Sequence, residues 1–222
     1  PVRISVVNRL PEPTAVHWHG IELESFSDGV AGWSGADMKV APMIAPNDSF
    51  TARLTLPRAG TFIYHTHLND IEQLTSGMYG PIVVLEPGQK FDPSTDHVFT
   101  VGWDGRAAGR GKEKVMVNGD TLATGPLTMA LGRTHRVRFI NIGPAGIYGF
   151  AIRQDTVPVK WRRRAKDGAD FPVSQRSETP ALVRLATGET FDAEWTPVQP
   201  GSYSFTVGRA SPWIYQRKLI VR

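Results

Sequence analysis

The sequence predicts an all-β fold built from sandwich or barrel domains. Three observations lead to this prediction. Apolar and β-branched residues occur in short alternating runs, Gly and Pro separate these runs, and no segment sustains a helical period. The 17 Pro and 22 Gly are spread through the predicted turns. Short strands with such turn punctuation are typical of β-sandwiches and barrels.

The predicted strands are short and bounded by turn residues. They cover Val2–Val7, Ser49–Leu56, Thr61–Tyr64, Pro81–Leu85, His97–Trp103 and His135–Asn141. The best helix candidate is one short turn over Asp70–Leu74. Because the chain opens inside an alternating strand and without Met, we expect further sequence upstream of residue 1.

A polar, turn-rich stretch over residues 86–95 lies between two apolar strands and indicates a domain boundary. We therefore expect two domains, residues 1–88 and residues 89–222, each of ordinary domain size. The segment 58–64 (RAGTFIY) resembles the segment 199–205 (QPGSYSF). This weak repeat indicates that one type of sandwich is used twice.

Composition and charge exclude several classes of protein. Lys and Arg number 25 against 21 Asp and Glu, an excess too small to indicate a nucleic-acid partner. The one dense basic run, residues 162–164, is interpreted as a solvated strand end. No apolar run reaches membrane-spanning length. The chain has no Cys, which excludes disulfides, thiolate catalysis and thiolate-bound metals within it.

Four of the six His fall in two His-x-His pairs, His17 with His19 and His65 with His67. On an extended chain, residues i and i+2 face the same side, with Cα atoms about 6.6 Å apart. The residue between each pair then points the other way, into packing. If the two pairs meet in space, four imidazoles converge. Protonated together they would repel one another, so a metal is the expected occupant near neutral pH.

The donor set alone leaves the metal open. Imidazole suits copper, zinc, iron and nickel. No carboxylate lies at ligand spacing within either pair, which disfavours an iron site of two His and one carboxylate. Copper and zinc remain equally good, and a zinc hydrolase that uses the same His is one alternative.

The remaining His, Trp and Met side chains are interpreted as packing residues. His97 and His135 begin strands and stand alone, so we expect surface or packing roles for both. Core aromatics are expected at Trp18, Trp33 and Trp103, and ordinary packing at Met38, Met43 and Met78.

The segments around the two His pairs resemble the copper motifs of the multicopper oxidases, the laccase-like family. Residues 13–21 (PTAVHWHGI) resemble the first motif, and residues 60–67 (GTFIYHTH) with 77–84 (GMYGPIVV) resemble the second. Further segments resemble the copper-free domain that follows in the family: residues 117–119, 132–141 and 165–169. The resemblance covers nearly the whole chain. It implies two cupredoxin-like Greek-key domains, the first with copper ligands and the second without.

The resemblance also implies a role for individual residues. His17 resembles the ligand of the lone type 2 copper, and His19, His65 and His67 resemble ligands of the paired type 3 coppers. Asp28 resembles the acidic residue near the type 2 copper that handles protons during oxygen reduction. Asp before Gly is also a common turn sequence, so a plain turn is the other interpretation of Asp28.

By resemblance, the protein is an oxidoreductase that reduces molecular oxygen to water at a trinuclear copper cluster. A reducing substrate, a phenol or a metal ion, is oxidised. The family's type 1 copper requires a Cys between two His. Here Thr66 stands at the comparable position, and no Cys is present.

We therefore expect this chain to hold type 2 and type 3 copper but no type 1 copper. It would supply half of the trinuclear ligands, with the type 1 copper half provided in cis or in trans. A stand-alone copper-binding module without turnover is the alternative. The resemblance implies a periplasmic or secreted location.

Overall fold

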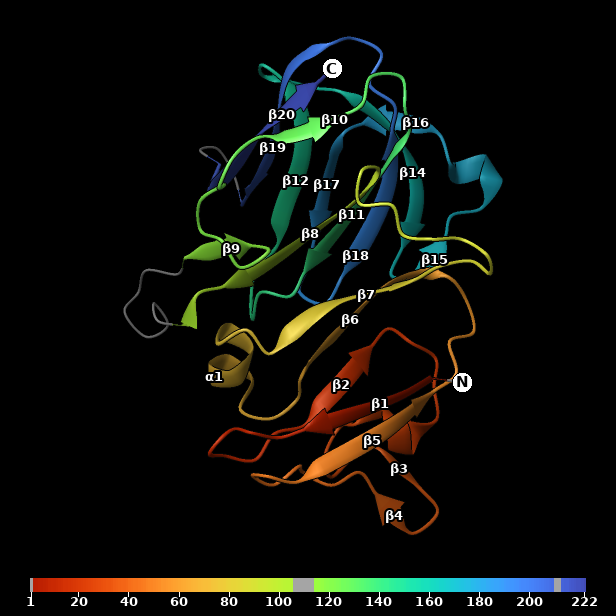
Figure 1. The fold of residues 1–222 in the computed structure, drawn as a ribbon, viewed down its shortest axis with the longest axis vertical. Coiled ribbons are helices and arrows are strands. Elements are labelled where there is room, and N and C mark those ends of the chain that lie inside the picture. The colour runs from red at the N-terminus through yellow and green to blue at the C-terminus, as the bar shows by residue number, and fades with distance from the viewer. Residues whose placement is uncertain (1, 106–113, 210–212) are drawn as a thin grey trace.

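The computed structural model describes residues 2–105, 114–209 and 213–222. Its strands form two groups stacked along the long axis of the molecule (Figure 1). The N-terminal group pairs as β1–β5, β2–β6–β7 and β3–β4. Its elements are β1 (Val2–Val7), β2 (Val16–His19), η1 (Ser25–Asp28), β3 (Gly35–Ala36), β4 (Lys39–Val40), β5 (Ser49–Leu54), β6 (Gly60–Thr66), α1 (Asp70–Thr75) and β7 (Tyr79–Val84).

The C-terminal group contains two larger sheets. One has the order β10-β20-β19-β12-β13 with β17 on β12, and the other β15-β14-β18-β11-β8-β9 with β16 on β14. The elements are β8 (Asp96–Trp103), β9 (Val115–Val117), β10 (Leu127–Met129), β11 (His135–Asn141), β12 (Tyr148–Gln154), β13 (Val157–Pro158), β14 (Lys160–Lys166), β15 (Ala169–Asp170), η3 (Val173–Gln175), β16 (Glu178–Pro180), β17 (Leu182–Leu185), β18 (Thr190–Trp195), β19 (Gly201–Gly208) and β20 (Tyr215–Val221).

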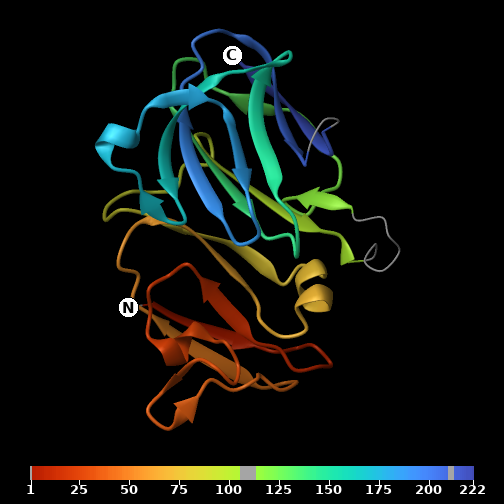
Figure 2. The same cartoon turned by 180° about the vertical axis from the view of Figure 1, so that it is seen from behind.

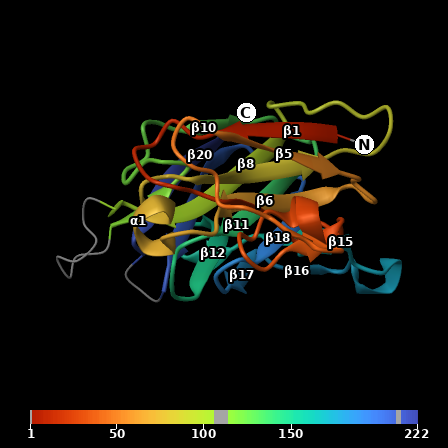
Figure 3. The same ribbon diagram turned by 90° about the horizontal axis from the view of Figure 1, so that it is seen from below.

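The two groups share no strand pairing within the described ranges. From behind, the N-terminal group lies against one end of the C-terminal sheets (Figure 2). From below, β1, β5 and β6 lie in front of the C-terminal strands (Figure 3). The expected boundary at residue 88 falls between β7 and β8, and the division into two domains stays a prediction. Among the described residues, no helix has the length and apolar character needed to cross a bilayer.

The predicted helix and strands are confirmed, and the residues at which they begin and end differ from the prediction. All six predicted strands form, and the predicted helical turn becomes α1. The strand expected over Thr61–Tyr64 extends to Gly60–Thr66, so it includes His65. The two segments of the weak repeat behave alike, because β6 begins at Gly60 and β19 begins at Gly201.

Aromatic side chains fill the space between the two C-terminal sheets. The ring centroid of Phe139 lies 5.3 Å from that of Phe150 and 5.4 Å from that of Trp161, and all three side chains are buried. A smaller core within the N-terminal group contains Trp18 and Phe62. A third apolar cluster joins the groups, since it takes residues from both: Ile63, Leu74, Ile140 and Ile142.

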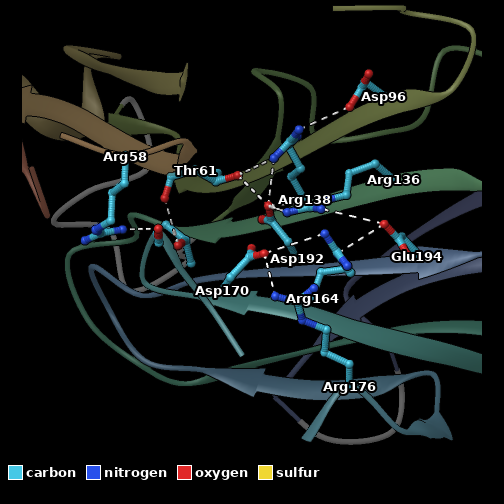
Figure 4. Close-up of polar contacts among 12 residues, drawn as sticks. Arg58, Thr61, Asp96, Arg136, Arg138, Arg164, Asp170, Arg176, Asp192 and Glu194 are labelled. Carbon is cyan, nitrogen blue, oxygen red and sulfur yellow. Dashed lines mark hydrogen bonds and ion pairs between the residues drawn. The ribbon is translucent and has the colours of Figure 1, made fainter. Parts of the chain in front are cut away.

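A buried ion network also joins the two groups (Figure 4). Asp192 of β18 is 1% exposed, and its Oδ2 accepts hydrogen bonds from Arg136, Arg138 and Thr61 at 2.8, 2.7 and 2.9 Å. Arg136 and Arg138 lie on β11, whereas Thr61 lies on β6. Arg138 also contacts Asp96 at 3.2 Å. A buried carboxylate is tolerated only when it is paired and hydrogen-bonded, so Asp192 holds β6 against the C-terminal sheet.

Three side chains predicted to pack are exposed instead. Trp33 is 87% exposed, Met38 is 97% exposed and Met43 is 57% exposed. All three lie in or beside the small β3–β4 hairpin, whose two-residue strands bury little. Composition could not reveal this, because an apolar residue in a loop has no periodicity to assign it to a face. The predicted packing roles of Trp18, Trp103 and Met78 are confirmed.

The basic run at 162–164 is not a strand end. It lies inside β14, between Lys160 and Lys166. Arg164 pairs with Glu194 at 3.2 Å and with Asp170 at 3.6 Å, and Arg163 lies over the ring of Phe171. The strand thus places Arg164 beside carboxylates of the same sheet, and only Arg162 of the three arginines is exposed.

The remaining two His are buried and paired. His97 of β8 and His135 of β11 are 6% and 0% exposed. His135 Nε2 lies 3.1 Å from the carbonyl of Ala130, so it carries the proton, and His135 Nδ1 accepts from His97 Nε2 at 3.1 Å. The packing role is therefore confirmed, but the expectation that each stands alone is wrong, because β8 and β11 are neighbours in one sheet.

Replacing Asp192 with Ala should destabilise the protein by roughly 3–5 kcal/mol, because two arginines then lose their buried partner. Asp170→Ala is the matched control. Its side chain is 49% exposed and pairs with Arg176 and Arg164, so about 1 kcal/mol or less is expected. Urea unfolding measures both. Equal losses for the two variants would contradict a special role for Asp192.

Acid should weaken the fold through His97. Burial, followed by the nearby His135, lowers the pKa of His97 to about 4. The unfolded chain therefore binds more protons once the pH falls below the ordinary value of about 6.5, and stability drops from there toward pH 4. In urea unfolding at pH 7 and pH 5, His97→Gln should lose less stability than the unaltered chain, by up to about 1 kcal/mol per pH unit. A parallel loss in both proteins would refute this.

Candidate metal centre

Antiparallel pairing of β2 with β6 brings the two His pairs together. The register places His17 directly opposite His65, and the strands continue in pairing to His19 and Ile63. Directly opposed residues have Cβ atoms about 4.5–5.5 Å apart. Since i and i+2 share a face, the imidazoles of both pairs lie on one side of this small sheet.

The four imidazoles lie close together, as predicted. The ring centroid of His17 is 5.5 Å from that of His19, 5.3 Å from that of His65 and 5.6 Å from that of His67. Ligand nitrogens of His17, His19 and His65 all fall within 4.8 Å of one another. His67 stands beside this trio, with its ring centroid 6.0 Å from that of His65.

The hydrogen bonds of His17 and His65 define which ring nitrogen of each could bind a metal. His17 Nδ1 faces only acceptors, the carboxylate of Asp28 at 3.0 Å and the Asp28 carbonyl at 3.2 Å. His65 Nδ1 faces the carbonyl of Thr66 at 2.6 Å. Both Nδ1 atoms therefore carry a proton, so that Nε2 is the nitrogen with the lone pair in the neutral form of either ring. His65 Nε2 lies 3.4 Å from His19 Nδ1, so two ring nitrogens point at the same small space.

Burial keeps part of this cluster neutral. Burial, with a smaller contribution from the nearby His17, lowers the pKa of His65 to about 4, even though the hydrogen bond to the Thr66 carbonyl acts in the opposite direction. Burial also lowers the pKa of His19, again with a contribution from His17. Metals bind the neutral form of imidazole, so at neutral pH His65 and His19 need not lose a proton to a metal.

Trp18 and Thr66, which stand between the two His of each pair, pack on the opposite face of the sheet. Trp18 is 4% exposed and Thr66 is fully buried, as the alternation predicts. The hydroxyl groups of Thr66 and Thr14 both donate to Gln73 Oε1, at 2.8 and 2.7 Å. Gln73 lies on α1 and is itself buried. The sequence did not predict the role of Gln73. A single Gln on one helical turn has no pattern that assigns it to the site, and only the packing of α1 beside β6 brings it to Thr66.

Asp28 ends the short helix η1 and reaches His17 from outside the sheet. Its second oxygen accepts a hydrogen bond from Ser34 at 3.1 Å. The following Gly29 has φ +80°, and a side chain there would lie 2.0 Å from the carbonyl oxygen of Val16. The Asp-Gly turn and the contact with His17 are thus one feature, because only Gly lets this turn approach β2 closely enough.

The donor set fits copper. Ligand nitrogens of three imidazoles converge, and in two of these rings carbonyl or carboxylate oxygens face Nδ1, which is the arrangement that metal-binding His adopt. Imidazole alone suits zinc as well as copper. The geometry therefore supports a metal centre without choosing between the two.

Comparison with known proteins supports copper. A family model described as multicopper oxidase matches residues 1–89. The copper resistance protein A homolog of Pseudomonas syringae pv. tomato is 40% identical over 99 residues, which are 44% of this chain and 15% of that protein. Laccase-5 of Trametes versicolor is 29% identical over 177 residues, 68% of this chain and 32% of the laccase. The chain thus spans at most about a third of these relatives' length.

Solved structures extend the likeness to the whole chain. The blue copper oxidase of Nitrosomonas europaea superposes with a TM-score of 0.76 at 22% identity, covering 99% of this chain and 73% of that one. The Botrytis aclada laccase gives a TM-score of 0.73 at 22% identity, over 98% of this chain and 44% of the laccase. At this identity the likeness shows the fold, and it confirms the predicted cupredoxin-like all-β architecture.

The family model is that of multicopper oxidases and the Pseudomonas syringae relative is named for copper resistance, which favours copper over zinc for the four-imidazole cluster. The match over residues 1–89 contains both His pairs and Asp28. The resemblance predicted from the His pairs is confirmed for this part of the chain, because residues 1–89 match the multicopper oxidase family model.

Proposed function

We propose that this chain is the part of a multicopper oxidase that supplies half of the ligands of a trinuclear copper cluster. The observation that carries the proposal is the convergence of ligand nitrogens from His17, His19 and His65 within 4.8 Å, with His67 beside them. His17 would hold the type 2 copper, and His19, His65 and His67 the type 3 pair. Copper held there would supply the electron transfer that reduces oxygen to water.

The chain's own residues prepare the ligands. Asp28 holds the proton of His17 on Nδ1, which leaves Nε2 as the metal-binding atom. The Thr66 carbonyl does the same for His65. Because both rings are fixed before a metal arrives, little side-chain freedom is lost when it binds.

Asp28 is also placed to move protons. Its side chain is 27% exposed, so the carboxylate contacts solvent while it contacts His17. Oxygen reduction to water consumes protons, and a carboxylate at the edge of the cluster can pass them inward from solvent. Ser34 donates to the same carboxylate and keeps it oriented toward the His.

The electron-entry site would lie outside these 222 residues. A type 1 copper depends on a thiolate ligand, and this chain has no Cys. We propose that the half with the type 1 copper is supplied in cis or in trans, and that the reducing substrate, a phenol or a metal ion, docks there. A periplasmic or secreted location belongs to the same proposal.

Copper titration tests the ligand assignment. Replacing His17 and His65 together with Ala should abolish copper binding, because the two best-fixed ligands are lost. His97→Gln removes a buried His outside the cluster and should bind as much copper as the unaltered chain. Copper per chain and electron paramagnetic resonance measure both, and no blue absorption is expected from the isolated chain.

Three outcomes would count against the proposal. Unchanged copper stoichiometry in the double variant would remove the site assignment. Zinc retention with hydrolytic activity, after growth with both metals, would favour a zinc enzyme. Copper uptake by a chain that never associates with a type 1 copper half would favour a stand-alone copper-binding module.

Asp28→Asn tests the proton role in the oxidase assembled with the type 1 copper half. The amide keeps the size of the side chain but cannot carry protons, so oxygen reduction should slow by roughly 10²–10⁴-fold. Copper stoichiometry should persist. Asp37→Asn, in the exposed turn between β3 and β4, is the control and should leave the rate unchanged. A rate for Asp28→Asn equal to that of the control would exclude Asp28 from proton transfer.

A further inference from the structure

The C-terminal group reaches the His cluster beside His19. A cavity of about 290 Å³ lies between the groups beside His19. The N-terminal group contributes His19 and Thr61 to its wall, and the C-terminal group contributes Thr187, Gly188 and Glu189 from the turn between β17 and β18. Neither the His pairs nor the copper motifs give any reason for this contact.

Gly188 touches the imidazole of His19. A Cβ built at this position would lie 3.0 Å from His19 Cε1 and 3.1 Å from Nε2, but 4.0 Å from Nδ1. Real Cβ atoms seldom approach so closely, so one of the two groups would have to move by a few tenths of an ångström. Gly188 therefore lies against the Cε1–Nε2 edge of the ring, whereas His19 Nδ1 faces His65 Nε2 at 3.4 Å.

The turn that carries Gly188 cannot easily retreat. The Gly188 amide donates to the carbonyl of Asn141 at 2.7 Å, and the Asn141 amide donates to the carbonyl of Glu189 at 3.1 Å. The hydroxyl of Thr187 donates to the carbonyl of Gly143 at 2.8 Å. Asn141 is fully buried and its side chain contacts two further carbonyls. The turn is thus fastened to the end of β11, and the ring of His19 is the group that can move.

We propose that Gly188 is a positioning residue for the metal centre, and that the C-terminal group sets the orientation of His19 through it. The inference rests on the proposed function, because it takes His19 to be a ligand. The imidazole contacts His65 through Nδ1 and the Gly188 backbone through its Cε1–Nε2 edge. A side chain at 188 displaces the ring and so changes the position of Nδ1 relative to the ligand nitrogen of His65.

The chain offers a matched control for backbone strain. Gly188 and Gly88 both have φ +82°, where a non-glycine residue is strained. A Cβ at Gly88 meets nothing within 4 Å, whereas a Cβ at Gly188 meets His19. Gly188→Ala and Gly88→Ala therefore carry the same kind of backbone cost, and only the first adds a contact with the cluster.

Competition with a chelator for Cu(II), on the full chain, tests the proposal. Gly188→Ala should bind copper about tenfold or more weakly, the usual effect of disturbing a residue that orients a ligand. Gly88→Ala should bind as the unaltered chain does. The imidazole ¹⁵N and ¹H resonances of His19 in the metal-free protein should shift in Gly188→Ala and stay in place in Gly88→Ala.

A second pair of variants covers the case in which Ala at 188 fails to fold. Asn tolerates the left-handed conformation better than Ala and has a larger side chain. Gly188→Asn should weaken copper binding at least as much, with Gly88→Asn unchanged. If the variants at position 188 bind copper as tightly as the unaltered chain and leave the His19 resonances unshifted, the proposal is overturned and the copper site stays intact. Absence of copper binding by the unaltered chain would instead remove the proposed function and the ligand role of His19 with it.

Discussion

Asp192 is the constraint on which the arrangement of the molecule depends. A carboxylate that is 1% exposed must be compensated, and here Arg136, Arg138 and Thr61 compensate it. Thr61 lies on β6, the strand that carries His65 four residues later. The contact that neutralises a buried charge in the C-terminal sheet thus also fixes the strand that carries His65 and ends one residue before His67. The apolar cluster around Ile63 and Ile140 also holds the two groups together, through hydrophobic contacts.

The His cluster combines close approach with low charge. Imidazoles at centroid distances of 5.3–6.0 Å would repel one another if protonated, and burial together with mutual proximity keeps His65 and His19 neutral near pH 7. Oxygen acceptors at His17 and His65 then decide which nitrogen holds the proton. The result is a set of lone pairs aimed at one space, which is what a metal needs. The C-terminal group contributes here too, because Gly188 borders the ring of His19.

Much of this could be predicted from the sequence, and the misses have physical causes. The alternation that located the strands also put Trp18 and Thr66 behind the ligands, since period 2 is a property of extended chain. The loop after Asp28 has no such period, so Trp33 and Met38 were expected inside and lie outside. His97 and His135 are 38 residues apart, and only the parallel pairing of β8 with β11 makes them partners.

The sequence by itself determined the all-β fold class, the two His pairs with their shared faces, and the absence of a thiolate ligand, because each follows from residue type and local spacing. Only the tertiary structure decided that His17 stands opposite His65, that burial lowers the pKa of His65 to about 4 and that Gly188 borders His19. Strand register, burial and contact between groups are set by residues far apart in the chain. No local pattern encodes them, because each depends on how distant surfaces pack against one another.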